Sequence, residues 1–175
     1  MTRPRLWMPL AGFALLFAIV AVALFRPADR TVRSQLVGQP LPAFTLPALV
    51  PGKPGLSRED MTGQGPRLLN IFGSWCLPCI AEAPQLMRLR AAGVPIDAIA
   101  IRDTGPAVAA FLARNGDPYR RIGDDQRSAV QLALGSSGVP ETFLIDAQGR
   151  IVRQYVGDIR ADQVDSVIAD WRAAQ

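Results

Sequence analysis

Two cysteines separated by two residues, Cys76 and Cys79, are the side chains best suited to chemistry, and the 175-residue chain has no others. They stand where an apolar run typical of a strand, residues 68–72, gives way to a helical pattern at residues 80–89. A thiol at a helix start lies near unpaired amide N–H groups and the positive end of the helix dipole, which both favour the thiolate. A thiol three residues later can reach back to the first. The spacing therefore predicts a dithiol that closes and opens reversibly.

Three other roles compete with redox chemistry. A structural disulfide across so short a loop would constrain the unfolded chain very little. A metal site needs about four ligands, and the chain has no histidine and no third cysteine. An inert buried pair fits poorly with Trp75 and Pro78, which mark an abrupt turn rather than a core strand. The absence of histidine also excludes a Ser-His-Asp triad, a histidine general base and a histidine haem ligand.

The first part of the chain is expected to anchor it in a membrane. Residues 6–25 are a run of twenty residues without a charge, with arginines on both sides. A helix of that length spans about 30 Å, the thickness of a bilayer's hydrocarbon core. The apolar part of a cleaved signal peptide has only about 7–15 residues, and the small residues 21–23 lie inside the run. An uncleaved anchor is favoured over a signal peptide and over a buried core helix, whereas the flanking arginines leave its orientation open.

The charge of the chain is concentrated near this segment. Of the 19 basic residues five precede Val37, and of the 15 acidic residues only one does, so the remainder is close to neutral. A near-neutral domain gives no sign of nucleic-acid binding. We expect an anchor at residues 1–25, a polar tether at 26–40 and one domain at 41–175, which is long enough for a proper core.

Apolar patterns along residues 41–175 predict alternating strands and helices. Prolines restrict residues 41–49 to an edge or irregular strand, and the loop 51–66 contains one helical turn at 57–61. We expect strands at 67–72 and 96–101, a short strand at 119–122, a hairpin of 142–146 with 150–156, and helices at 80–89, 106–115, 128–134 and 160–172. The order β-α-β-α followed by β-β-α, with the dithiol at the first strand-to-helix turn, is a thioredoxin-like layout.

Several segments resemble a known family. Residues 75–79, Trp-Cys-Leu-Pro-Cys, resemble the WCxxC motif of the thioredoxin superfamily. The preceding segment 68–74 resembles the membrane-anchored subfamily that works in cytochrome c maturation (CcmG, also called DsbE). Glu82, three residues after the second cysteine, and the stretch 138–146, Gly-Val-Pro-Glu-Thr-Phe-Leu-Ile-Asp, are similar to the same family around its cis-proline. The resemblance covers roughly residues 37–173 and the anchor.

The resemblance implies an α/β thioredoxin-like fold, a central mixed β-sheet flanked by helices, with an N-terminal transmembrane helix. It implies that Cys76 is the nucleophile and Cys79 the resolving thiol, with no cofactor or metal besides their disulfide. The domain would face the periplasm from the bacterial inner membrane and reduce disulfides of apocytochrome c or its haem-ligation partners. A membrane thiol carrier of the DsbD or CcdA type would then reduce it again.

Five further residues are expected to support the dithiol. Glu82 lies on the same helix face as Cys79, where a carboxylate would raise the thiol pKa and could accept its proton; the alternative is a solvated acid that complements the helix dipole. Glu141 has the same two interpretations. Pro140 is expected to be cis rather than an ordinary trans loop proline, which would free the backbone of Val139 to pair with a substrate.

Trp75 is expected to cover the site as a flat hydrophobic surface rather than to fill the core. Two other functions remain as alternatives to cytochrome c maturation. One is a general periplasmic reductant of the TlpA or ResA type, or an oxidant of the DsbA type, although such oxidants prefer a histidine in the dithiol motif and a helical insertion. The other is a thioredoxin-like module that carries a metal or binds a partner.

Overall fold

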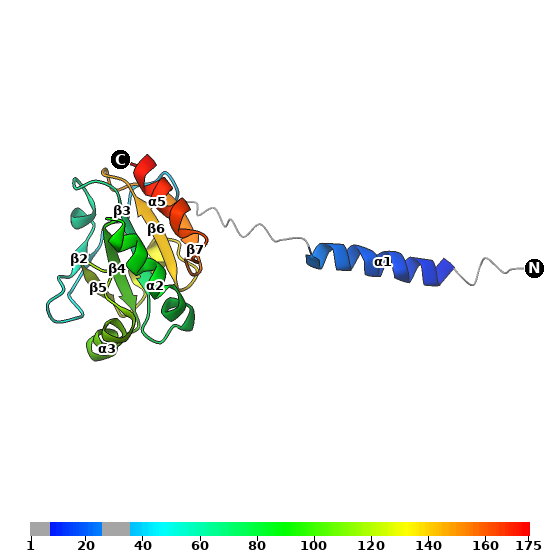
Figure 1. Ribbon diagram of the computed structural model, residues 1–175, viewed down its shortest axis with the longest axis horizontal. Coiled ribbons are helices and arrows are strands. Elements are labelled where there is room, and N and C mark those ends of the chain that lie inside the picture. The colour runs from blue at the N-terminus through cyan, green and yellow to red at the C-terminus, as the bar shows by residue number, and fades with distance from the viewer. Residues whose placement is uncertain (1–7, 26–35) are drawn as a thin grey trace, which may run out of the picture. The chain divides into compact units, whose positions relative to one another are not determined.

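The computed structural model describes residues 8–25 and 36–175, and the chain divides into two compact units, Met1–Thr31 and Val32–Gln175. The first unit contains one uncharged 18-residue helix, α1 (Met8–Phe25) (Figure 1). Among the described helices, none combines the length and the apolar character that crossing a membrane requires. The predicted transmembrane helix is therefore not confirmed. Most of the predicted tether lies outside the described residues, and the proposed domain boundaries stay a prediction.

The second unit is built on a five-stranded mixed sheet with the strand order β5-β4-β3-β6-β7 (Figure 1). The central strand β3 pairs in parallel with β4 and antiparallel with β6, while β4–β5 is parallel and β6–β7 antiparallel. The strands are β3 (Arg67–Phe72), β4 (Ile96–Ile101), β5 (Ile122–Asp125), β6 (Glu141–Ile145) and β7 (Ile151–Val156). The strands at 67–72 and 96–101 and the C-terminal hairpin are confirmed.

Strand β3 is buried on both faces, and its alternation decides which side chains reach the helix that follows it. Leu68 and Phe72 belong to one core cluster, whereas Leu69 and Ile71 belong to the other, because successive side chains of a strand point to opposite faces. Asn70 is fully buried on the Leu68 and Phe72 face. A polar side chain is thus placed inside an apolar core.

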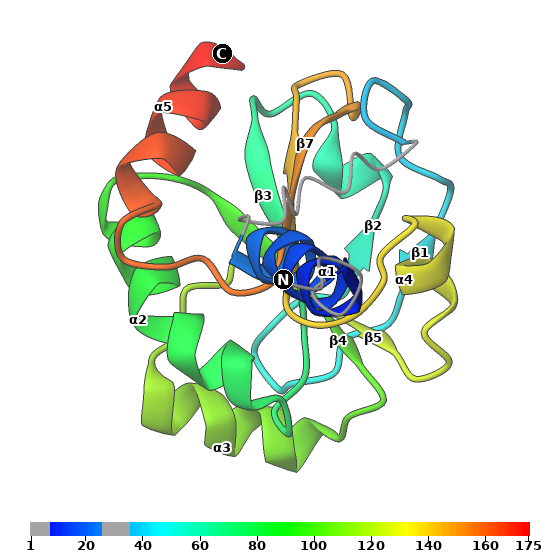
Figure 2. The same ribbon diagram turned by 90° about the vertical axis from the view of Figure 1, so that its right-hand side faces the viewer.

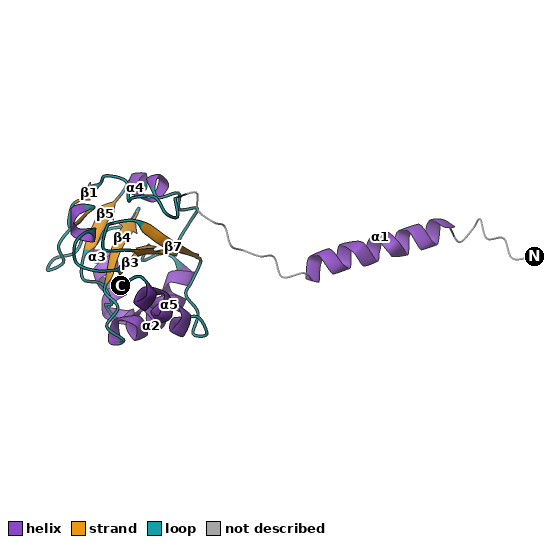
Figure 3. Ribbon diagram, turned by 90° about the horizontal axis from the view of Figure 1, so that it is seen from above, coloured by secondary structure: helices purple, strands orange, loops and turns teal. Residues whose placement is uncertain are grey.

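Helices cover both faces of this sheet (Figure 2 and Figure 3). The face that carries Asn70 packs against α2 (Leu77–Ala91), α3 (Gly105–Asn115) and α5 (Val164–Ala173), which all contribute to the first core cluster. The opposite face packs against α4 (Ala129–Ala133), the 3-10 turn η2 (Glu59–Met61) and the small hairpin of β1 (Thr45–Leu46) and β2 (Leu56–Ser57). These layers confirm the thioredoxin-like fold.

Two of the predicted elements are present with different bounds. The short strand lies at Ile122–Asp125 rather than at 119–122, because Tyr119 turns into the core, where its ring lies 5.0 Å from that of Phe72. The last helix begins at Val164 rather than at 160. The residues before it form a turn, in which the backbone N–H of Arg160 donates to the side chain of Gln163 at 2.9 Å.

Candidate active site

The two cysteines form a disulfide in the first turn of α2, with their Cα atoms 5.3 Å apart. The helix begins at Leu77, three residues earlier than expected, since a proline is well tolerated in the first helical turn. Cys76 is the N-cap residue, and its Sγ accepts a hydrogen bond from the backbone N–H of Cys79 at 3.2 Å. In this oxidised form both side chains are buried, at 4% and 2% exposure. The predicted ring is therefore present at a helix N-terminus.

Trp75 directly precedes Cys76 and remains 54% exposed. Its indole Nε1 donates a hydrogen bond to the carbonyl oxygen of Ile101 at 3.4 Å. A Cβ atom on Gly73 would lie 2.7 Å from the indole ring, so only glycine allows the ring to fold back over the chain. This placement agrees with the expected surface position of Trp75 and not with a core filler.

Asp103 holds the same turn. Its buried carboxylate accepts hydrogen bonds from the backbone N–H of Ser74 at 2.5 Å and from the Ser74 hydroxyl at 2.9 Å. It also accepts one from the N–H of Thr104 at 2.8 Å, while the Thr104 hydroxyl caps α3. The end of β4 is therefore fastened to the turn that leads into the cysteines.

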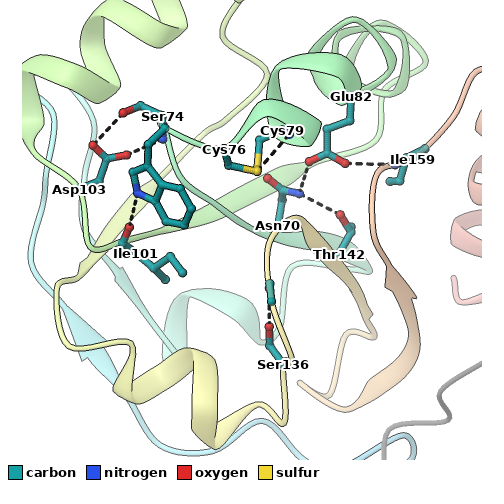
Figure 4. The surroundings of a disulfide bond; sticks show 12 residues. Asn70, Ser74, Cys76, Cys79, Glu82, Ile101, Asp103, Ser136, Thr142 and Ile159 are labelled. Atoms are coloured by element: carbon teal, nitrogen blue, oxygen red, sulfur yellow. Dashed lines mark hydrogen bonds between the residues drawn. A yellow bond between two sulfur atoms is a disulfide. The ribbon is translucent and has the colours of Figure 1, made fainter.

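Glu82 is fully buried one helical turn after Cys79, so its interpretation as a solvated acid is wrong. Its carboxylate oxygens accept hydrogen bonds from the side chain of Asn70 at 3.0 Å and from the backbone N–H of Ile159 at 3.1 Å (Figure 4). Burial raises the pKa of Glu82 to about 7, the two hydrogen bonds oppose that rise, and the nearby charge of Asp158 adds to it. The residue can thus gain or lose a proton near neutral pH.

Asn70 connects Glu82 to the rest of the core, a link that the sequence reasoning missed. Its Nδ2 donates both to Glu82 and to the hydroxyl of Thr142, the latter at 2.9 Å, and its Oδ1 accepts from the hydroxyl of Tyr119 at 2.8 Å. Burial, together with the charges of Glu82 and Asp117, raises the pKa of Tyr119 well above its ordinary value. The one available signal was an asparagine in an otherwise apolar buried strand.

The loop before β6 contains Ser136, which Figure 4 shows below the cysteines. The Val139–Pro140 peptide bond is cis, as expected. Val139 packs against both core clusters, and among residues 36–175 no hydrogen bond uses its backbone N–H or carbonyl. Glu141 is buried, so its solvated interpretation is wrong.

The carboxylate of Glu141 accepts hydrogen bonds from the backbone N–H of Ser137 at 3.0 Å and from its hydroxyl at 2.7 Å. It accepts a third from the side-chain amide of Gln154 at 2.9 Å. Glu141 therefore braces the loop that contains Pro140.

A disulfide at the start of a helix, a neighbouring cis-proline loop and a mixed sheet with helices on both faces define a thioredoxin-like thiol:disulfide oxidoreductase. The family model described as Redoxin matches residues 36–169. The thiol:disulfide interchange protein DsbE of Pseudomonas fluorescens biotype C is 39% identical, covering 95% of this chain and 94% of that protein. The DsbE homolog of Paracoccus denitrificans is 33% identical over 98% of this chain and 95% of its own length.

Solved structures agree in fold. A thioredoxin-family thiol:disulfide interchange protein from Chlorobium tepidum has a TM-score of 0.62 at 24% identity and covers 77% of this chain and 94% of its own. A secreted disulfide oxidoreductase from Mycobacterium tuberculosis has a TM-score of 0.62 at 22% identity, with 75% and 96% covered. With its Cys76–Cys79 disulfide, the chain belongs to the DsbE (CcmG) family of thiol:disulfide interchange proteins.

Proposed function

We propose that the protein is a disulfide reductase of cytochrome c maturation, which reduces cysteines of apocytochrome c or of its haem-ligation partners in the bacterial periplasm. The residues 6–25 would anchor it in the inner membrane, with the N-terminus inside and the dithiol domain outside. The observation that carries the reductive direction is the fully buried Glu82, held one turn after Cys79. The cytochrome c pathway is supported by the resemblance of residues 68–74, 75–79 and 138–146 and by relatives named DsbE.

The exchange proceeds in two balanced steps. The thiolate of Cys76 attacks one sulfur of the substrate disulfide, so that a mixed disulfide forms and the other substrate sulfur leaves as a thiolate, which takes up a proton. Cys79 then loses its proton and attacks the Cys76 sulfur, which releases the second substrate thiolate and closes the Cys76–Cys79 ring. Two electrons pass from the protein to the substrate. A membrane thiol carrier of the DsbD or CcdA type would return them.

Glu82 acts on the second step in two ways. With a pKa of about 7 it is able to accept the proton that Cys79 gives up near neutral pH. Its negative charge, buried one turn from that thiol, also disfavours a thiolate there. A protein whose thiolate is disfavoured gives up its electrons more easily, the reverse of a strong oxidant such as DsbA, whose reduced form is stabilised.

Substrate contact is expected at the Val139 loop and at Trp75. The unused backbone groups of Val139 are suited to pair with an extended substrate segment, next to the cis Pro140. Trp75, next to Cys76 in the chain, supplies an exposed apolar surface. Glu141 contributes indirectly, because its hydrogen bonds to Ser137 hold the Val139 loop in place.

A trapping experiment in the native host tests this function. Cys79→Ser leaves the nucleophile but removes the resolving thiol, so mixed disulfides with the substrate should accumulate and can be identified by mass spectrometry. Cys76→Ser is the matched control and should trap nothing. Apocytochrome c or haem-ligation proteins in the trapped fraction support the proposal, whereas many unrelated secreted proteins and intact holocytochrome assembly in the strain without both cysteines would contradict it.

The reduction potential separates the reductant from a general oxidant. A reductase should have a potential well below the roughly −120 mV of a strong oxidant such as DsbA, measured by equilibration with glutathione. A value near that of DsbA would contradict the reductive direction even if the trapped partners were cytochromes. Stoichiometric copper or zinc binding without disulfide exchange would instead identify a metal carrier.

A further inference from the structure

Another buried acid, Asp103, accepts hydrogen bonds from the turn that leads into the cysteines. Asp103 is only 5% exposed, and its two oxygens accept three hydrogen bonds. Two of them come from Ser74, the residue two positions before Cys76, and the third comes from Thr104. Figure 4 shows the Asp103 carboxylate directed at Ser74, on the opposite side of the cysteines from Glu82. The buried carboxylate of Asp103 therefore stabilises the conformation of this turn.

The chain around Asp103 is itself held in an uncommon conformation. Arg102 has φ 46° and Ser128 has φ 54°, in the left-handed region that residues other than glycine rarely adopt. The two are joined by a hydrogen bond from Arg102 Nε to the Ser128 hydroxyl at 3.1 Å. The side chain of Gln126 also donates to the Asp103 carbonyl. Backbone conformations of this kind, held by surrounding contacts, concentrate at functional sites.

The turn at residues 73–75 depends on these contacts because it belongs to no helix or strand. Ser74 is held by Asp103, and Trp75 is held by the carbonyl of Ile101. The Gly73 carbonyl accepts the backbone N–H of Cys76 at 3.1 Å. Each of the three residues is thus tied either to the end of β4 or to the first cysteine.

We infer that Asp103 is a positioning residue for disulfide exchange, whatever the substrate. By fixing residues 73–75 it keeps the sulfur of Cys76 within reach of Cys79 at the start of α2. Closure of the ring depends on the effective concentration of one sulfur at the other, which falls when the backbone of either is free to move. A loosened turn favours the dithiol over the disulfide. It also slows the step in which Cys79 attacks the Cys76 sulfur and the substrate sulfur leaves with the electron pair.

Four variants of the full chain test the inference: Asp103→Asn, Ser74→Ala, the double variant that combines them, and a control. Asp103→Asn keeps the size of the side chain but replaces one accepting oxygen with a donor. Ser74→Ala removes only the hydroxyl bond. Asp146→Asn is the matched control, because the carboxylate of Asp146 accepts the backbone N–H groups of Gln148 and Arg150 at 2.9 and 2.8 Å in the β6–β7 turn, at the end of the sheet where β3 begins. Each variant is equilibrated with reduced and oxidised glutathione, and its rate of mixed-disulfide resolution is measured by stopped flow.

We expect the equilibrium constant for ring formation to fall at least tenfold in Asp103→Asn, which corresponds to a potential about 30 mV higher. The fall should be about threefold in Ser74→Ala, and the double variant should resemble Asp103→Asn alone, because both changes break one shared contact. Asp146→Asn should stay within twofold. If Asp103→Asn and Ser74→Ala also stay within twofold while losing thermal stability as the control does, the inference is wrong. If Asp103→Asn does not fold, the equilibrium constant of Ser74→Ala decides: a threefold fall supports the inference, and a change within twofold contradicts it.

Discussion

Replacing Glu82 by glutamine should remove a large pH dependence of the stability of the oxidised protein. The pKa of Glu82 is raised from 4.5 to about 7, chiefly by burial. Between these two values the folded protein keeps the proton while the unfolded chain has lost it. Stability is therefore highest below pH 4.5, falls as the pH rises toward 7, and is constant above that value. In the disulfide form no thiol titrates, so the cysteines add nothing to this change.

The size of the effect follows from the difference between the two pKa values. Each pKa unit corresponds to about 1.4 kcal/mol, so the raised pKa costs about 3 kcal/mol of unfolding free energy between pH 4.5 and 7.5. No discount for solvent screening applies, because the side chain has no exposed surface. Glutamine carries no charge at any of these pH values. Relative to the parent, Glu82→Gln should thus become more stable by about 3 kcal/mol as the pH rises from 4.5 to 7.5.

The assay is guanidinium unfolding of the oxidised parent and variant at pH 4.5, 6 and 7.5, with linear extrapolation to water. Only the difference between the two proteins matters, because the other titrating groups are common to both. Replacement of an exposed acid, Glu59→Gln, is the control. Its difference from the parent in unfolding free energy should not change with pH. A flat difference for Glu82→Gln as well would refute the raised pKa and with it the assignment of Glu82 as proton acceptor.

Three further predictions concern the buried polar network and the core. Asn70→Ala removes a hydrogen bond that lowers the pKa of Glu82, so the stability loss should extend to higher pH in the same unfolding series; a loss that ends at lower pH would contradict this. Tyr119→Phe leaves the Asn70 carbonyl oxygen without its donor and should cost about 1–3 kcal/mol in urea unfolding, with an unchanged reduction potential; a changed potential would show that the hydroxyl acts on the dithiol. Arg67 and Asp97 form a fully buried pair at 3.2 Å, in which burial outweighs the arginine and raises the Asp97 pKa. Arg67→Ala should therefore cost about 3–5 kcal/mol, and the apolar double variant Arg67→Met with Asp97→Leu should recover most of that loss; an additive loss would refute the reasoning.

The elements around the dithiol were predictable because their patterns are local. The apolar run of β3 and the hairpin of β6 and β7 each depend on neighbouring residues. Cys76 and Cys79 were identified from their spacing and from the turn between strand and helix. The cis bond at Pro140 was expected from the resemblance.

Contacts between distant residues were not predictable in the same way. The predicted strand at 119–122 includes Tyr119, but the hydroxyl of this residue reaches Asn70, 49 residues earlier in the chain. Glu82 was correctly placed on the face of Cys79, yet its partner Ile159 lies 77 residues later. The role of Asp103 was missed for the same reason, since Ser74 is 29 residues away. A pattern along one element shows which face is buried but not which polar group meets another there.

Three buried acids lie around the dithiol, and the groups that donate hydrogen bonds to them indicate different roles. Asp103 accepts two of its three bonds from the N–H and hydroxyl of Ser74, and Glu141 accepts two of its three from the same groups of Ser137. Each acid thereby holds one of the loops that flank the disulfide. Glu82 accepts only two bonds within the described part of the chain, from one side-chain amide and one backbone N–H, and burial outweighs them. Two acids fix the geometry of the site, and the third, which accepts the fewest hydrogen bonds, is the one proposed to exchange a proton with Cys79.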